Sequence, residues 1–253
     1  MTSVRVIKDA SVGWVILDRP ESMNALTVET GRELEEALRS LGRDASINVI
    51  AIRGAGGNFC AGGDFREVER LREGGAEGLR PLFEAFAAAC GAVAQVEMPV
   101  VAVVEGVAAA GGFELMQAVD LVVVSDNARL SDSHIRFGQV PGGGSTQRLP
   151  RLLGRQQAFG LLVSGDVLSG AEAVTLGLAY RSFPAPTFEE EATAFLRTLA
   201  SRHRDALVRI KRLVYAGQRT DLENGLDLEL STVLEHIAGE AGGTGVEAFK
   251  TRR

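Results

Sequence analysis

The chain has few cysteines and histidines, and it lacks a long uninterrupted hydrophobic run. Its 253 residues include 2 cysteines, with no Cys-x-x-Cys pair, and 3 histidines, so we expect neither a disulfide scaffold nor a metal site. The most apolar stretch, 99–124, is interrupted by acidic residues, which argues against a membrane span. The first eight residues have no apolar segment typical of a secretory signal. Together these absences predict a cytoplasmic protein.

The charge and the hydrophobic content of the chain argue against a nucleic-acid-binding protein and against a disordered one. The formal net charge is -6 and the isoelectric point is about 5.3, which argues against nucleic acid as the main partner. Hydrophobic residues make up 45% of the chain and charged residues 24%. Because this composition can bury a core, we do not expect disorder.

Glycine, in contrast, is abundant. The chain contains 30 glycines, where an average frequency would give about 18. Twelve of them fall in three short windows: 54, 56, 57, 62 and 63; 106, 111 and 112; and 138, 142, 143 and 144. None of the windows matches the dinucleotide fingerprint, the phosphate-binding loop or the nucleophile elbow. We therefore interpret them as turns where the backbone needs a positive φ or a close approach.

Apolar runs and helical spacing alternate along the first two thirds of the chain, which predicts an α/β fold. Strands are expected at 4–7, 12–17, 49–53, 100–104 and 121–124, and helices after Thr27 and over 82–96 and 113–118. Ser169-Gly-Ala-Glu172 and Thr187-Phe-Glu-Glu190 each fit a capping box. From Thr187 the pattern is helical, and Pro184-Ala-Pro186 marks a boundary between a core, 1–186, and a C-terminal helical region, 187–253.

The C-terminal region is also rich in basic residues. Between Arg197 and Arg219 there are seven arginines and lysines and one acidic residue. This pattern indicates either a solvated helix face or a contact with an anionic ligand or a neighbouring subunit.

Two glycine windows and one carboxylate indicate chemistry. The segments 58–65 and 105–114 each follow an apolar strand and lead into a helix, so each leaves backbone N–H groups unpaired at a turn. Two such donors that converge would form an oxyanion hole. Glu114 follows Gly111 by three residues on an apolar helix, where burial would raise its pKa into the range of a general acid or base. Alternatively, Glu114 pairs with an arginine or caps a local turn.

These two segments, together with the third glycine window and the residues after it (140–154), resemble the crotonase superfamily, the enoyl-CoA hydratase/isomerase family. The resemblance runs from Leu17-Asp-Arg-Pro-Glu-Ser-Met-Asn-Ala-Leu26 to the Phe-Lys-x-Arg ending at Phe249. It implies a spiral of ββα units with a C-terminal helical region, assembled as a homotrimer or homohexamer. It also implies an acyl-CoA thioester as substrate, no other cofactor, and a place in fatty acid metabolism.

The resemblance assigns roles to individual residues. It implies that the backbone amides of Gly63 and Gly111 stabilise a thioester enolate, and that Asp64 shapes the loop near the pantetheine. By position in the motifs, the CoA-binding residues are Ser22, Met23, Ala25, Ala61, Asp64, Gly112, Pro141 and Gly142. Glu114 matches the first of the two catalytic glutamates of the family's hydratases.

The chain departs from the family at the second catalytic glutamate. This residue belongs seven positions before the Pro-Gly of the third motif, and His134 stands there. His134 is either a substituted acid or base, since an imidazole can accept and donate a proton near neutral pH, or a residue without catalytic use.

Three functions remain open at this point. The favoured one is an enzyme of the hydratase/isomerase type, a hydro-lyase, in which Glu114 and His134 share the proton transfers. The alternatives are a decarboxylase, hydrolase or carbon–carbon lyase acting on a less common acyl-CoA, and a non-catalytic acyl-CoA-binding subunit.

Overall fold

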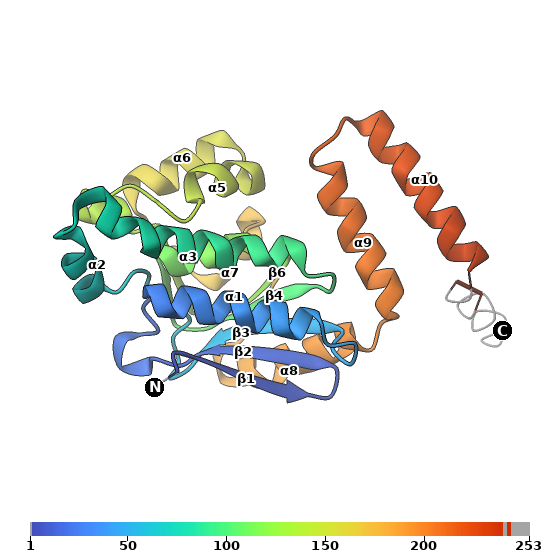
Figure 1. The fold of residues 1–253 in the computed structure, drawn as a ribbon, viewed down its shortest axis with the longest axis horizontal. Helices are drawn as coiled ribbons and strands as arrows, with labels where there is room; N and C mark the ends of the chain where they lie inside the picture. The colour runs from blue at the N-terminus through green and yellow to red at the C-terminus, as the bar shows by residue number, and fades with distance from the viewer. Residues whose placement is uncertain (1, 240–241, 244–253) are drawn as a thin grey trace.

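The computed structural model, which describes residues 2–239 and 242–243, has a central sheet of six strands (Figure 1). The strand order is β1 (Val4–Asp9), β2 (Val12–Leu17), β3 (Val49–Gly54), β4 (Val100–Val104), β6 (Leu121–Ser125) and β8 (Arg181–Phe183). β1 and β2 are antiparallel, and every later pair is parallel. The carboxyl ends of β2, β3, β4, β6 and β8 therefore lie along one edge, where the glycine turns follow.

A second, two-stranded parallel sheet pairs β5 (Val107–Ala109) with β7 (Arg129–Ser131). Cys60 forms an isolated parallel bridge with Ala108, which adds the first glycine segment to this sheet. Three segments that are far apart in the sequence thus run parallel at one end of the molecule.

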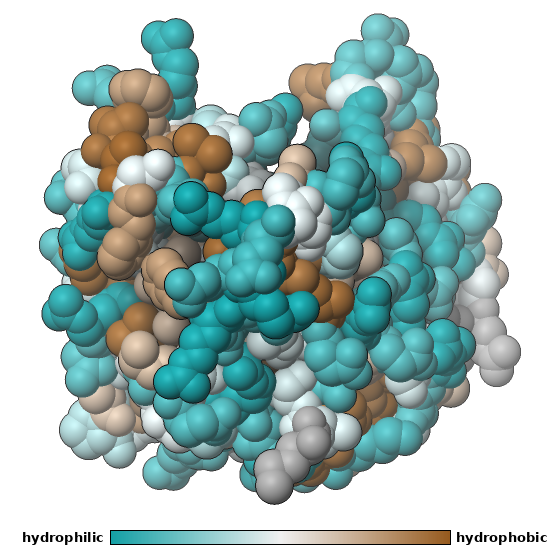
Figure 2. Space-filling view, turned by 60° about the vertical axis from the view of Figure 1, so that its left-hand side comes forward, coloured by the Kyte–Doolittle hydropathy of each residue, from teal (hydrophilic) through white to brown (hydrophobic). Residues whose placement is uncertain are grey.

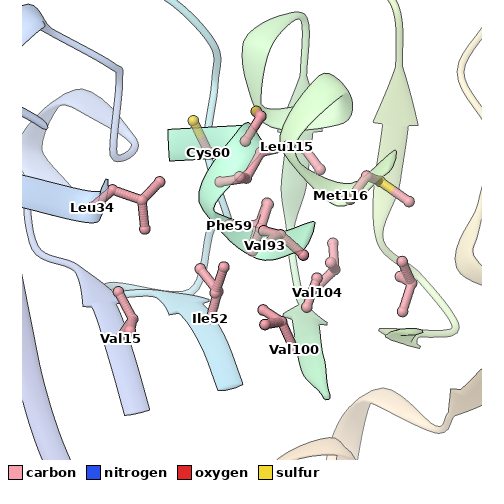
Figure 3. Packing of buried hydrophobic residues seen from close by; sticks show 14 of the residues in the cluster. Val15, Leu34, Ile52, Phe59, Cys60, Val93, Val100, Val104, Leu115 and Met116 are labelled. Atoms are coloured by element: carbon pink, nitrogen blue, oxygen red, sulfur yellow. The ribbon is translucent and has the colours of Figure 1, made fainter. Parts of the chain in front are cut away.

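Helices cover both faces of the main sheet (Figure 1). α1 (Val28–Gly42) and α3 (Gly75–Gln95) pack on one face, and α8 (Phe188–Ala200) packs on the other. Alternate residues of β2 divide accordingly, since Val15 belongs to the first core and Trp14 to the second. Figure 3 shows the first core, where Phe59 and Val93 lie between Leu115 of α4 and the strand residues Ile52 and Val100.

The remaining helices surround this framework. They are η1 (Pro20–Ser22), α2 (Phe65–Arg72), α4 (Gly111–Ala118), η2 (His134–Phe137), α5 (Ser145–Leu153), α6 (Arg155–Ser164), α7 (Gly170–Leu176), η3 (Ala185–Thr187), α9 (Arg204–Gly217) and α10 (Leu222–Ala238). In Figure 1, α9 and α10 form a hairpin that stands away from the sheet.

A buried lysine attaches this hairpin to the core. Lys211 of α9 is 8% exposed. Its Nζ lies 2.7 Å from Asp120 Oδ2 and donates hydrogen bonds to the carbonyls of Val93 and Met98. Because these partners lie at the end of α3 and just before β4 and β6, the lysine fixes the middle of α9 to the core.

The structure confirms the α/β class and the helical character of the described C-terminal residues. The Ser169 capping box is present, but the Thr187 box is wrong, because Thr187 ends η3 and its side chain makes no cap hydrogen bond. The helix expected over 82–96 begins earlier, at Gly75, and β5, β7 and β8 were not predicted. These strands have three residues each, too few to show a period.

The division at residue 186 stays a prediction. α8 packs under the sheet with Trp14 and Val101, so the first helix of the C-terminal region contributes to the core. The Phe249 ending lies outside the described residues. Several basic residues between Arg197 and Arg219 contact this chain itself, as in the pairs Arg197–Asp9 and Arg209–Asp205. These contacts favour the solvated-face interpretation of that segment over an anionic ligand.

Candidate active site

The two predicted glycine turns lie in register at one end of the small sheet. Cys60 pairs with Ala108 in parallel; three residues further along each segment lie Gly63 and Gly111. The parallel alignment holds as far as Ala109, whose N–H donates to Cys60 O at 2.9 Å, and the two turns with the glycines follow from there. A Cβ atom on Gly62 would lie 3.0 Å from Gly111 N, which shows how closely the two turns approach.

The N–H groups of Gly63 and Gly111 donate no hydrogen bond to any residue that the structure describes. Gly63 forms a parallel bridge with Leu26, in which Leu26 N donates to Gly62 O and Asp64 N donates to Leu26 O. In a parallel bridge of this kind the N–H of the central residue, here Gly63, points away from the partner segment. Gly111 begins α4, where N–H groups have no partner within the helix.

Ala110 sets the direction of the second turn. It has φ 47° and ψ -116°, a combination that an alanine adopts only when its surroundings hold it there. Its N–H donates to Ser131 O at 3.0 Å, which ties the turn to the end of β7.

Glu114 lies in the first turn of α4 and is 2% exposed. Its Oε1 accepts hydrogen bonds from Gly143 N at 2.7 Å and Ser145 N at 3.0 Å, at the start of α5. Burial raises the pKa of Glu114 above its ordinary value, and these hydrogen bonds and the nearby His134 offset the shift only in part. The capping alternative is thus realised by one oxygen, while Oε2 lies 3.8 Å from His134 Nε2.

Gly143 has no room for a side chain. A Cβ atom there would lie 2.2 Å from Phe86 Cε1 and 2.7 Å from Glu114 Oε2. Because only glycine permits this approach, its backbone can come close enough to hold the carboxylate.

His134 begins η2 and faces Glu114 from the other side. Its Nδ1 lies 2.6 Å from Oδ1 of Asp132, which is 1% exposed. Burial by itself would lower the pKa of the imidazole, but the hydrogen bond and charge of Asp132 and the charge of Glu114 outweigh it. The pKa of His134 therefore lies above its ordinary value.

A cavity of about 800 Å³ opens beside the glycine turns. Six residues singled out in the sequence line it: Ser22, Met23, Ala25, Ala61, Gly63 and Asp64. Asp64 caps α2 through Arg66 N and Glu67 N and pairs with Arg19 at 2.8 Å. Burial raises the pKa of Asp64, but the pair with Arg19 and these amides lower it overall.

The other predicted site residues lie elsewhere. Glu114, His134 and Gly111 do not line the cavity, although Ser133, which precedes His134, and Ala109, two residues before Gly111, do. Gly112 is buried, and a Cβ there would lie 2.1 Å from Cys60 O, so it allows two segments to pack. Gly142 lines a separate cavity of about 530 Å³ along α3. Pro141 lines neither cavity. All these assignments stay predictions.

Sequence reasoning did not predict two features of the site. One is the contact between Asp132 and His134, although an acid two residues before a histidine was visible. The other is a group of arginines on the cavity wall, Arg66, Arg129 and Arg136, which form no ion pair with any described residue. They come from α2, β7 and η2, and only the fold brings them together.

Residues 2–239 and 242–243 contain no cluster of three or more His, Cys, Asp or Glu side chains that could hold a metal ion. Within the same residues, no helix has the length and apolar character needed to span a membrane.

Solved structures share this fold over almost the whole chain. The enoyl-CoA hydratase from Polaromonas sp. JS666 matches with a TM-score of 0.94 and 30% identity, covering 99% of this chain and 97% of that one. The enoyl-CoA hydratase from Bacillus anthracis matches with a TM-score of 0.92 and 31% identity, covering 99% and 97%. The protein therefore has the crotonase fold, as the sequence predicts.

The sequence comparisons identify the family to which the chain belongs among proteins with this fold. The family model described as enoyl-CoA hydratase/isomerase matches residues 8–253. The probable enoyl-CoA hydratase echA8 of Mycobacterium bovis is 32% identical over 252 residues, covering 99% of this chain and 96% of the relative. The chain belongs to the enoyl-CoA hydratase/isomerase family and is an acyl-CoA enzyme of the crotonase superfamily.

Proposed function

We propose that this protein is a hydro-lyase that adds water across the 2,3-double bond of an enoyl-CoA thioester. The observation that carries the proposal is the position of two acid–base groups, Glu114 Oε2 and His134 Nε2, 3.8 Å apart. They lie next to two turns whose N–H groups, at Gly63 and Gly111, donate to no described residue.

In the proposed reaction, the two glycine amides bind the thioester oxygen and stabilise the charge that it gains. Glu114 Oε2 takes a proton from water, and the hydroxide oxygen bonds to C3 of the substrate. The electrons of the double bond move to the thioester oxygen as an enolate. His134 Nε2 then donates a proton to C2, and the transfer of a proton from Glu114 to His134 restores both groups.

The directions of the two pKa shifts support this division of roles, with Glu114 as the base and His134 as the proton donor. The pKa of Glu114 is raised, chiefly by burial, which makes it a stronger base than an exposed carboxylate. The pKa of His134 is also raised, against the effect of burial, by Asp132 and Glu114, so the imidazole holds its proton more readily and can act as the donor.

A panel of short and long enoyl-CoA and β-keto-acyl-CoA thioesters, followed by mass spectrometry, tests the reaction. The hydratase proposal expects the mass of one water to be added to an enoyl-CoA. Loss of carbon dioxide or of CoA would instead indicate a decarboxylase or a hydrolase. Binding of every thioester without turnover would indicate a non-catalytic subunit.

The unpaired arginines favour an anionic substrate such as CoA, whose phosphates carry several negative charges. Arg66, Arg129 and Arg136 line one cavity and are exposed. We expect Arg66→Gln or Arg136→Gln to raise KM by about tenfold with kcat nearly unchanged, since a hydrogen bond to a charged group contributes about 1.5 kcal/mol or more. Arg43→Gln, at the far end of α1, serves as the control. Equal KM values in all three variants would exclude these arginines from substrate binding.

The helical hairpin supports the proposal of a homotrimer or homohexamer. Leu222, Leu226, Leu230, Val233 and Ile237 follow helical spacing on α10 and are between 39% and 78% exposed. Glu235, which lies 3.6 Å from Arg209 of α9, is on the opposite side of the helix. In Figure 2 the molecule rises at the upper left and at the upper right, and both raised parts carry brown, hydrophobic surface. A stripe of this length on one helix is typical of a protein–protein contact.

Sedimentation measures the oligomeric state directly. We expect Leu226→Glu to dissociate the oligomer, whereas Ser231→Glu, on another side of the same helix, leaves it intact. A monomeric wild-type protein at micromolar concentration would contradict this proposal without affecting the proposed reaction.

A further inference from the structure

We propose that Asp132 is a positioning residue, which fixes the His134 imidazole in the orientation and tautomer that present Nε2 to Glu114. The relevance to turnover rests on the proposed function. The geometric part, the control of the imidazole by Asp132, concerns the protein without substrate.

The backbone places Asp132 on the same framework as the second glycine turn. Asp132 directly follows β7, whose last residue, Ser131, accepts a hydrogen bond from Ala110 N at 3.0 Å. Ala110 precedes Gly111 in the chain. The positions of Asp132 and of the Gly111 N–H are therefore coupled through one hydrogen bond between β7 and the turn that follows β5.

The contacts of the carboxylate point to the imidazole. Asp132 is 1% exposed, and Oδ1 lies 2.6 Å from His134 Nδ1. Oδ2 has no hydrogen-bond partner among the described residues. A buried polar atom without a partner costs about 1–3 kcal/mol, so the stability of the fold does not account for a carboxylate at this position. Orientation of His134 does.

The tautomer follows from the hydrogen bond. An ionised carboxylate only accepts hydrogen bonds, so the proton between the two residues belongs to Nδ1. The other ring nitrogen, Nε2, is then the one that exchanges protons at the site, and it is the atom 3.8 Å from Glu114 Oε2. The ionisable groups in contact with the imidazole, within the described part of the chain, are Asp132 from the turn after β7 and Glu114 from α4.

Nuclear magnetic resonance titration of the histidine rings in the full-length protein tests the first part. The chain has 3 histidines, and His134→Gln identifies the His134 signals by their loss. In Asp132→Asn we expect the titration of His134 to move to lower pH and the share of the Nδ1–H tautomer to fall. Asp126→Asn is the matched control, since the Asp126 side chain makes no hydrogen bond within the described residues. An unchanged titration and tautomer in Asp132→Asn would overturn the proposal.

A double-mutant cycle tests whether Asp132 acts through His134. On the wild-type background, Asp132→Asn should lower kcat by about 100-fold or more, in the range of a general acid–base contribution. KM should change little, because Asp132 does not line the cavity. On the His134→Gln background the same change should have almost no further effect. Equal losses on both backgrounds would refute the proposal.

The two readouts separate this proposal from the proposed function. A shifted titration in a protein that turns over none of the thioesters supports the positioning of His134 and rejects the hydratase reaction. Hydration with an unshifted titration supports the hydratase reaction and rejects the role of Asp132.

Discussion

Glu114 and His134 face each other across the candidate site, but the protein holds them by different means. Two backbone amides at the start of α5 bind one oxygen of Glu114. A single side chain, Asp132, binds His134. Backbone donors depend on the fold and persist through most substitutions, whereas one substitution removes a side-chain partner. The partners of Glu114 are therefore harder to remove by substitution than the single partner of His134.

The comparison also bears on the prediction that His134 stands at the position of a catalytic glutamate of this family. A second carboxylate here would lie near Glu114 and Asp132, and like charges in a buried site disfavour ionisation. The imidazole instead lies between the carboxylates of Glu114 and Asp132, and in the proposed reaction it is the proton donor. The proposed site therefore has two groups able to transfer protons, with less buried negative charge than a second glutamate would bring.

Among the proposed substitutions, removal of the Glu114 charge should have the largest effect on kcat. We expect Glu114→Gln to lower kcat by about 10²–10⁴-fold, because the amide can still accept the two backbone hydrogen bonds but cannot take a proton. Thioester affinity should remain nearly unchanged. Steady-state kinetics and a binding titration check this result, with Glu105→Gln, in the same glycine segment, as control. Full activity of Glu114→Gln would exclude it as an acid or base.

A methyl group at Gly143 should disturb the surroundings of Glu114, with a smaller effect on turnover. Because the new Cβ would lie 2.2 Å from Phe86 Cε1, Gly143→Ala should lower the free energy of unfolding by about 1–3 kcal/mol. We also expect kcat to fall, since Glu114 has to move.

The matched control for this change is Gly160→Ala in α6, where a Cβ would have no atom within 4 Å. It should stabilise the protein by about 0.5–1 kcal/mol, as expected for alanine in place of glycine within a helix. Chemical denaturation measures both variants. If they behave alike, the close contact at Gly143 has no energetic consequence.

The pH dependence of stability should show the smallest effect. The folded-state pKa of Glu114 is raised, so its contribution to stability is fully present below the ordinary value of 4.5 and is lost as pH rises through the folded-state pKa. Glu114→Gln has no such ionisation. Its Tm should therefore increase relative to that of the wild type as pH rises, which thermal unfolding across a pH series measures. A constant Tm difference would contradict the shift.

The sequence predicted the glycine turns that lie at the candidate site. Glycine clusters after apolar strands indicated turns with free amides, and the family resemblance singled out Gly63, Gly111, Glu114 and His134. The turns and the longer strands could be predicted because glycine content, strand hydrophobicity and residue spacing are local properties of the chain. The roles of Gly63, Gly111, Glu114 and His134 stay predictions. The short strands β5, β7 and β8 were missed, since three residues carry too little periodicity and depend on their neighbours for pairing.

The contacts between distant segments of the chain could be determined only from the tertiary structure. Which groups contact Glu114 could not be decided from α4 alone, because its two amide donors, Gly143 just before α5 and Ser145 at its start, are 29 and 31 residues away. The arginines of the cavity come from three separate elements. Asp132 lies two residues from His134, yet its inward orientation follows from the pairing of β5 with β7. Local residue patterns fix which groups the chain carries, and the packing of the parallel strands fixes which of them meet.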